Sequence, residues 1–209
     1  MEQQKEYLQI RNNIYSFLYR MYLEEPPKQL AIDLVKGTFP IPTGIIHVNS
    51  DLDEGVTLLN KYMQKSKNAG DVYEKIHDEY TRLFIGPGRL PAPPYESMYR
   101  DNKMHGPSLL ELKQFYREVG IERYDYAEPE DNIAFELRFM NYLGEKMLHE
   151  NMTKYLELQK RFMDEHLLKW VPVFCDDLFA SDLSDLYKGI AKFTKGFVFF
   201  DRSALNELL

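Results

Sequence analysis

One short segment of the sequence carries residues suited to metal chemistry. Glu74 and His77 lie three apart, which places both on one face of a helix. A di-iron site in a helical bundle needs two such Glu-x-x-His pairs together with further glutamates. The sequence holds no second pair, since Glu145 and His149 are four apart. We therefore expect no di-iron centre and no other bound cofactor.

Asp78 directly follows His77, and such a His-Asp pair also occurs in all-helical metal-dependent phosphohydrolases. Those sites need an earlier histidine and a later aspartate, because one pair leaves most ligand positions empty. The residues available here are His47 and Asp101. A metal-dependent phosphohydrolase is thus one alternative, and the competing interpretation is that His77 and Asp78 are ordinary half-exposed helix residues.

A second candidate site is rich in carboxylates. Between residues 122 and 136 the chain has one base, Arg123, and six acids: Glu122, Asp125, Glu128, Glu130, Asp131 and Glu136. Carboxylates pair with guanidinium groups through two parallel hydrogen bonds. Pro129 suits the first turn of a helix, which would place Asp131 in that turn and Asn132 on one face with Glu136. The segment therefore predicts a site for arginine side chains, although acids at a helix start also simply complement its dipole.

A rigid loop provides the apolar counterpart. Four prolines fall between Gly86 and Tyr95, and proline fixes the backbone and removes hydrogen-bond donors, so this stretch should be extended. Tyr80, Leu83 and Phe84 precede it at the spacing of one helix face, which is also the spacing of a core stripe. Together the loop and the acidic segment suit a peptide that carries arginines beside an apolar stretch.

These two motifs carry a family resemblance. Tyr80-x-x-Leu83-Phe84 is followed by Gly-Pro-Gly-Arg-Leu-Pro-Ala-Pro-Pro-Tyr-Glu-Ser-Met-Tyr at 86–99, and by Glu-Pro-x-Asp-Asn-Ile-Ala-x-Glu-Leu at 128–137. In this order, and with the later segment 166–172, they resemble the TorD/DmsD family of redox-enzyme maturation chaperones. The resemblance covers most of the chain.

The resemblance implies a cytoplasmic, all-helical chaperone without catalytic activity. Its partners would be the twin-arginine signal peptide and the apo-form of a molybdenum-cofactor enzyme, which it would hold back from export. The implied peptide-binding residues are Tyr80, Leu83, Phe84, Pro93, Pro94 and Tyr95 on one side, and Glu128, Pro129, Asp131, Asn132 and Glu136 on the other. Asn132 stands where the family usually has histidine, and asparagine can form hydrogen bonds but cannot titrate. A generic helical interaction module is the remaining alternative, and both a monomer and a homodimer stay open.

The elements that must position these residues are helices. Apolar residues recur at three and four positions from Tyr7 to Met21, and Pro26 ends that stretch. Further helices are expected over residues 29–36, 51–67, 71–84, 108–120, 129–147 and in 153–209, with a break at Pro172. Asp51, a capping box of Asp71 and Glu74, and another of Ser108 and Glu111 are the expected N-terminal caps. No alternating strand pattern occurs, so the prediction is one all-α domain over residues 1–209, a bundle of about nine or ten helices.

Composition narrows the class further. Hydrophobic residues make up 44% of the 209, enough for a packed core. Cys175 is the only cysteine, so no internal disulfide can form. The net charge of −7 argues against nucleic acid, which demands basic patches. No apolar run reaches the length of a membrane span, and the first fifteen residues do not form an apolar leader, so we expect a soluble protein.

Overall fold

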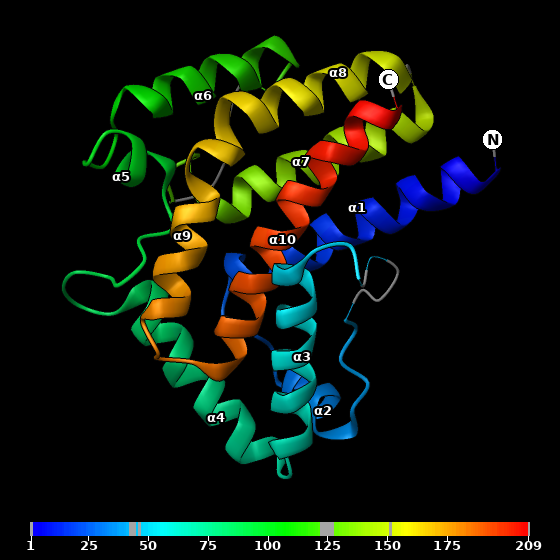
Figure 1. Ribbon diagram of the computed structural model, residues 1–209. Coiled ribbons are helices and arrows are strands. Elements are labelled where there is room, and N and C mark those ends of the chain that lie inside the picture. Colours follow the sequence, from blue (N-terminus) through cyan, green and yellow to red (C-terminus); the bar gives the residue numbers. More distant parts are fainter. Residues whose placement is uncertain (1, 42–44, 46, 122–127, 151, 209) are drawn as a thin grey trace. The chain divides into compact units, whose positions relative to one another are not determined.

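The computed structural model describes residues 2–41, 45, 47–121, 128–150 and 152–208 (Figure 1). Within these ranges the regular elements are ten α-helices and two π-helical turns, which confirms the all-α prediction. In chain order they are α1 (Glu2–Leu23), α2 (Lys28–Lys36), α3 (Ser50–Lys65), α4 (Ala69–Tyr80), η1 (Thr81–Ile85), α5 (Glu96–Arg100), α6 (Pro107–Glu118), α7 (Ile133–His149), α8 (Met152–Phe162), η2 (Met163–Leu167), α9 (Leu168–Ala180) and α10 (Asp185–Leu208). Among the described helices, none is both long and apolar enough to cross a membrane.

The helices form two compact units, each built from separate parts of the sequence. Unit 1 comprises Met1–Tyr19, Pro94–Val173 and Asp201–Leu209, and unit 2 comprises Arg20–Pro93 and Phe174–Phe200. In unit 1, α7 packs along α8, and α5 contacts α6 (Figure 1). In unit 2, α2 packs along α4. The assignment of residues 1–209 to one domain stays a prediction.

An aromatic cluster forms the centre of each unit. In unit 1 the ring of Phe139 lies 4.6 Å from that of Tyr116 and 4.7 Å from that of Phe162, and Phe115 packs 5.2 Å from Phe162. In unit 2 the cluster consists of Tyr22, Tyr80, Phe84, Phe174 and Tyr187. Ring contacts of this kind contribute beyond the burial of area, so these clusters hold the helices at fixed spacings.

Two helices of unit 2 approach each other unusually closely. A Cβ atom added to Gly55 of α3 would lie 2.6 Å from the backbone nitrogen of Phe193 in α10. A Cβ atom added to Gly196 of α10 would lie 2.6 Å from the backbone nitrogen of Leu52. Glycine is therefore required at both positions, because any side chain would meet backbone atoms that cannot move independently.

Asparagines cap two helices for which the sequence predicted other residues. The Asn49 side chain accepts from the backbone N–H of Leu52 at the start of α3, and the Asn68 side chain accepts from Gly70 at the start of α4. The predicted caps Asp51 and Asp71 lie inside the first turns of these helices. Those predictions were wrong because an asparagine two or three residues earlier already supplies the capping oxygen.

The predicted capping box of Ser108 and Glu111 does not form either. Pro107 is the first residue of α6, and Gly106 before it has no side chain with which to cap. The Ser108 hydroxyl donates instead to Asp101, and Glu111 pairs with Arg100. Asp101 thus takes the capping role, because its carboxylate also accepts from the backbone N–H of Ser108 at 3.0 Å.

Pro172 lies inside a helix rather than at a break. Helix α9 begins at Leu168 and continues through Pro172 to Ala180. Proline removes only the hydrogen bond that its own N–H would donate to residue 168, the first residue of this helix. The π-helical turn η2 directly precedes that position. The missing bond therefore falls where the regular α-helical pattern has only just begun.

Candidate functional site

The last two residues of the proline loop, Pro94 and Tyr95, meet the acidic motif in unit 1. Tyr95 and Asn132 form an isolated antiparallel bridge. On either side of it, the backbone N–H of Glu96 donates to the carbonyl of Asp131 at 2.9 Å, and that of Ile133 donates to Pro94 at 2.9 Å. We call residues 94–97 and 128–133 the junction. Two motifs that are more than thirty positions apart in the sequence are thus joined through backbone hydrogen bonds.

At the surface of the junction a tyrosine reaches the first acid of the motif. The Tyr95 hydroxyl donates to Glu128 Oε2 at 2.6 Å. Glu128 is exposed, while Tyr95 and Pro129 are half-buried and Pro94 is buried. Burial, followed by the hydrogen bond to the Glu128 carboxylate, raises the pKa of Tyr95 well above its ordinary value. Tyr95 therefore stays protonated and acts as a donor.

Asp131 and Asn132 precede helix α7, which corrects the prediction that Pro129 opens it. Asn132 is the N-cap of α7, and its side chain accepts from the backbone N–H of Ala134 at 2.9 Å. The Asp131 side chain is fully buried and accepts from the backbone N–H of Ser97, in the first turn of α5, at 2.9 Å. The helix starts later than predicted because Asn132 has the extended backbone of a bridge residue and a better capping group. The Asn132 and Asp131 side chains therefore accept hydrogen bonds from backbone N–H groups in the first turns of α7 and α5, respectively.

Glu136 is enclosed one turn into α7. Its side chain is fully buried, and the indole N–H of Trp170 donates to Oε2 at 3.2 Å. Oε1 has no hydrogen-bond partner within the part of the chain that the structure describes. Burial raises the pKa of Glu136 well above its ordinary value, and the neighbouring Glu96 carboxylate raises it further. These surroundings therefore favour the neutral form of Glu136 over the ionised form.

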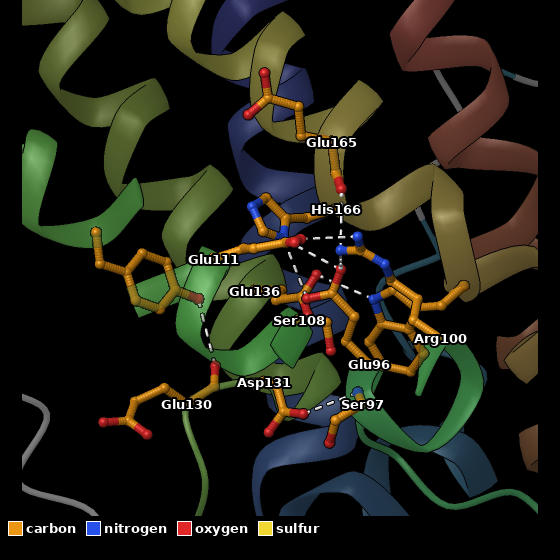
Figure 2. Close-up of polar contacts among 12 residues, drawn as sticks. Glu96, Ser97, Arg100, Ser108, Glu111, Glu130, Asp131, Glu136, Glu165 and His166 are labelled. Atoms are coloured by element: carbon orange, nitrogen blue, oxygen red, sulfur yellow. Dashed lines mark hydrogen bonds and ion pairs between the residues drawn. The ribbon is translucent and has the colours of Figure 1, made fainter. Parts of the chain in front are cut away.

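Beside the junction lies a buried charge cluster that the sequence analysis did not predict (Figure 2). Nδ1 of His166 lies 3.1 Å from both carboxylate oxygens of Glu96. Arg100 donates to Glu96 at 2.7 Å and to Glu111 at 2.8 Å. Glu96 is fully buried and His166 is 2% exposed, so this pair depends on its own partners rather than on water. The signal available in the sequence was the four-residue spacing of Glu96 and Arg100, which allows an ion pair on one helix face.

The cluster borders an open pocket in unit 1. Its volume is about 400 Å³, and its lining residues are Arg100, Glu111, Gln114, Phe115, Glu118, Asp164, Glu165, His166 and Lys169. The lining thus contains four carboxylates, two side chains that are always positively charged, Arg100 and Lys169, and one histidine. Such a surface offers mainly hydrogen-bond acceptors, which suits a donor-rich ligand better than an anion.

The predicted site residues of unit 2 lie mostly in its core. Tyr80 is 4% exposed and donates to the backbone carbonyl of Tyr22 at 3.2 Å, and Leu83 is fully buried. Phe84 and Pro93 are half-buried. Ile85, which the sequence analysis did not single out, is 64% exposed at the end of η1. Peptide binding by these residues stays a prediction.

Three of the candidate metal ligands have another partner. His47 pairs with Asp53, His77 pairs with Glu25, and the Asp101 carboxylate binds Ser108. Across the described ranges, no group of three histidine, cysteine, aspartate or glutamate side chains is arranged to hold a metal ion. Glu122, Arg123 and Asp125 of the acidic segment lie outside the described residues.

Comparison with known proteins identifies the family of this all-helical chain. The family described as nitrate reductase delta subunit matches residues 48–176, a range that contains both motifs. The chain belongs to this family, and the resemblance to the TorD/DmsD redox-enzyme maturation chaperones is confirmed.

Among its relatives is a probable Tat proofreading chaperone DmsD from Haemophilus influenzae, 36% identical over 58% of this chain and 57% of that protein. The chain thus matches a little over half the length of that relative. A chaperone protein TorD from Vibrio cholerae is 26% identical over 75% of this chain and 74% of that protein. A crystal structure of a putative redox enzyme maturation protein from Archaeoglobus fulgidus aligns over 94% of this chain and 93% of that one, with 21% identity and a TM-score of 0.46.

Proposed function

We propose that this chain is a cytoplasmic chaperone that binds the twin-arginine signal peptide of a molybdenum-cofactor oxidoreductase and assists its maturation before export. Relatives named as Tat proofreading chaperones and as the chaperone TorD support this proposal. The matched family range includes the proline loop and the acidic motif. The chain acts by binding and has no catalytic role in this proposal.

The observation that carries the proposal is the junction. Its surface pairs an aromatic ring, Tyr95, with an exposed carboxylate, Glu128, on backbone that hydrogen bonds hold in place. A signal peptide with arginines beside an apolar stretch needs both kinds of group. Preorganised backbone also lowers the entropy lost on binding.

Within the junction the residues have different roles. Tyr95, Glu128 and Pro129 are the members that a peptide can reach, while Asp131 and Asn132 hold the two backbone segments together. The buried Glu136 carboxyl group accepts a hydrogen bond from the Trp170 indole and so helps to hold that ring in place. Direct contact of the peptide with Asp131 or Glu136 stays a prediction, and it requires these fully buried side chains to become accessible.

Replacing Tyr95 tests the proposal directly. We expect Tyr95→Ala to weaken a twin-arginine signal peptide by about five- to a hundredfold, since a central aromatic contact contributes about 1–3 kcal/mol to binding. Because Tyr95 is only half-buried, the melting temperature should change little. Calorimetric titration with the peptide and with its twin-lysine version measures both affinities.

Tyr73 supplies a matched control. It is also half-buried, and its hydroxyl donates to the Glu25 carboxylate at 3.2 Å. Tyr73→Ala should leave peptide affinity unchanged. If Tyr95→Ala lowers the melting temperature by many degrees and leaves peptide affinity intact, Tyr95 is only a structural residue. If the wild-type chain binds no signal peptide, a generic helical interaction module becomes the better interpretation.

A further inference from the structure

A guanidinium group of the chain itself, that of Arg161, contacts three residues that line the pocket in unit 1, although Arg161 is not one of the lining residues. The Cζ atom of Arg161, on α8, lies 4.2 Å from the centre of the Phe115 ring. One nitrogen of Arg161 donates to Glu118, and Nε lies 3.7 Å from the Glu165 carboxylate. Phe115, Glu118 and Glu165 all line the pocket. An aromatic face between two carboxylates is a favourable place for arginine, because the planar group can stack and form hydrogen bonds at the same time.

His166 also lines the pocket, and it is 2% exposed. Its Nδ1 lies 3.1 Å from both oxygens of the fully buried Glu96 carboxylate. This contact holds the ring in place at the edge of the pocket.

The charges around the pocket favour a cation once Arg161 moves away. Glu111 pairs with Arg100, and Asp164 pairs with Arg202. Glu118 and Glu165 have Arg161 as their cation. Departure of Arg161 would leave these two carboxylates uncompensated. Two lining cations oppose a cationic ligand: Arg100, which is paired with Glu96 and Glu111, and Lys169, which lies exposed with no ion pair in the described part of the chain.

We propose that this pocket is a subsite for an arginine side chain of a bound peptide, and that in the free protein Arg161 pairs with two of its carboxylates, Glu118 and Glu165. Identification of the peptide as a twin-arginine signal rests on the function proposed above. Asp131 and Glu136, the acceptors expected from the sequence, are fully buried, whereas the pocket is open. Arginine from the peptide replaces Arg161 as the partner of Glu118 and Glu165.

The pocket also lies within reach of a peptide held at the junction. Glu96 follows Tyr95 directly, starts α5 and contacts both His166 and Arg100. Helix α5 has five residues, so its length is about 7 Å, which two or three residues of extended peptide can span. One peptide can therefore place an apolar stretch at Tyr95 and an arginine in the pocket.

Charge-neutralising variants test the subsite. Two probes are titrated by calorimetry or by amide chemical shifts: N-acetyl-arginyl-arginine amide and the signal peptide. We expect the double variant Glu118→Gln with Glu165→Gln to weaken both at least tenfold. Arg161→Gln should tighten both about two- to fivefold, since it removes an internal competitor held by a half-exposed ion pair. The dilysine analogue should respond less, because an ammonium cannot stack and pair in the same way.

Two matched controls lie on the same helix. On α8, Glu157→Gln makes half the charge change of the double variant, and Lys160→Gln makes the same charge change as Arg161→Gln; neither residue lines the pocket. Both should leave affinity within about twofold, which separates local competition from the general effect of net charge. Circular dichroism establishes that each variant remains folded.

The outcomes separate this subsite from the proposed function. If the signal peptide binds, but Arg161→Gln does not tighten it and the double variant does not weaken it, the subsite is wrong and the function stands. If the signal peptide does not bind, while the diarginine probe follows the expected pattern, the subsite stands and the function is wrong. If neither probe binds, both are overturned.

Discussion

Three of the carboxyl groups that are completely enclosed in unit 1 lie at or beside the junction, and each is stabilised differently. Glu96 has two cationic or titratable partners, Arg100 and His166. Asp131 accepts from a backbone N–H at the start of α5. Within the described part of the chain, Glu136 has only the indole N–H of Trp170 as a hydrogen-bond donor, and its raised pKa favours the neutral form. Burial of a carboxyl group is tolerable when it is paired, hydrogen-bonded or neutral, and all three solutions occur side by side.

Glu136 should make stability depend on pH. Its folded-state pKa is raised above the unfolded value of about 4.3, so the folded state binds the extra proton. Its contribution is fully present below that unfolded value and is lost as pH rises toward the folded pKa, with a slope of up to about 1.4 kcal/mol per pH unit. We expect Glu136→Gln to remove this loss while keeping an acceptor for Trp170. Urea unfolding from pH 4 to pH 8 measures the free energy of unfolding at each pH.

Glu145→Gln is the control for this experiment, since Glu145 is exposed on the same helix. The difference between Glu136→Gln and wild type should grow with pH, whereas the control should run parallel to wild type. A constant difference across the whole range would show that Glu136 does not keep a proton in the folded protein.

At the scale of elements, the sequence predicted which segments are helical better than where each helix begins. Apolar spacing and Pro26 correctly placed α1 and α2, because periodicity and proline act through the local backbone. The start of α7 was misplaced by four residues, since Asn132 is fixed by a bridge to Tyr95, a contact that local sequence does not encode. The combination of the two motifs into one peptide site rested on their complementary chemistry, and the family resemblance implied the same site. The enclosure of Asp131 and Glu136 was missed because burial depends on packing between distant segments.

The close contact of α3 with α10 gives a prediction that opposes helix propensity. Alanine at an interior helix position is ordinarily about 1 kcal/mol more favourable than glycine. At Gly55 the added Cβ would meet backbone of Phe193, so we expect Gly55→Ala to destabilise the protein by about 1–3 kcal/mol. Gly196→Ala should do the same from the other helix. Thermal unfolding of both variants would contradict this packing if either melted at or above the wild-type temperature.

At the scale of the whole chain, its first and last helices are tied together inside unit 1. Arg11 of α1 forms a two-nitrogen ion pair with Asp201 of α10, and the Tyr15 hydroxyl donates to Asp201 at 2.6 Å. Arg11 is 2% exposed and Asp201 is fully buried. Burial disfavours the charged guanidinium, but the Asp201 carboxylate outweighs that effect and raises the pKa of Arg11. The pair therefore remains ionised inside the protein.

Removing one member of this pair should be costly. Asp201→Ala leaves the Arg11 charge buried without its partner, so we expect a loss of about 3–5 kcal/mol in the free energy of unfolding. Asp177→Ala, at an exposed aspartate of α9, is the control and should change stability by less than about 0.5 kcal/mol. Guanidinium denaturation measures both. A loss below about 1 kcal/mol for Asp201→Ala would show that the pair does not hold these two helices.

Hydrogen exchange of the backbone amides beside the Tyr95–Asn132 bridge also reports how readily the junction opens. The amide hydrogens of Glu96 and Ile133 lie on its two sides, and each is held by a carbonyl of the opposite segment. Both can exchange with solvent deuterium only when the segments separate, so their exchange rates report the same opening event. If a peptide binds to the closed junction, the two amides slow together and by the same factor. If a peptide instead inserts between the segments, both accelerate together, and one pair of peaks in an amide spectrum distinguishes the two modes of binding.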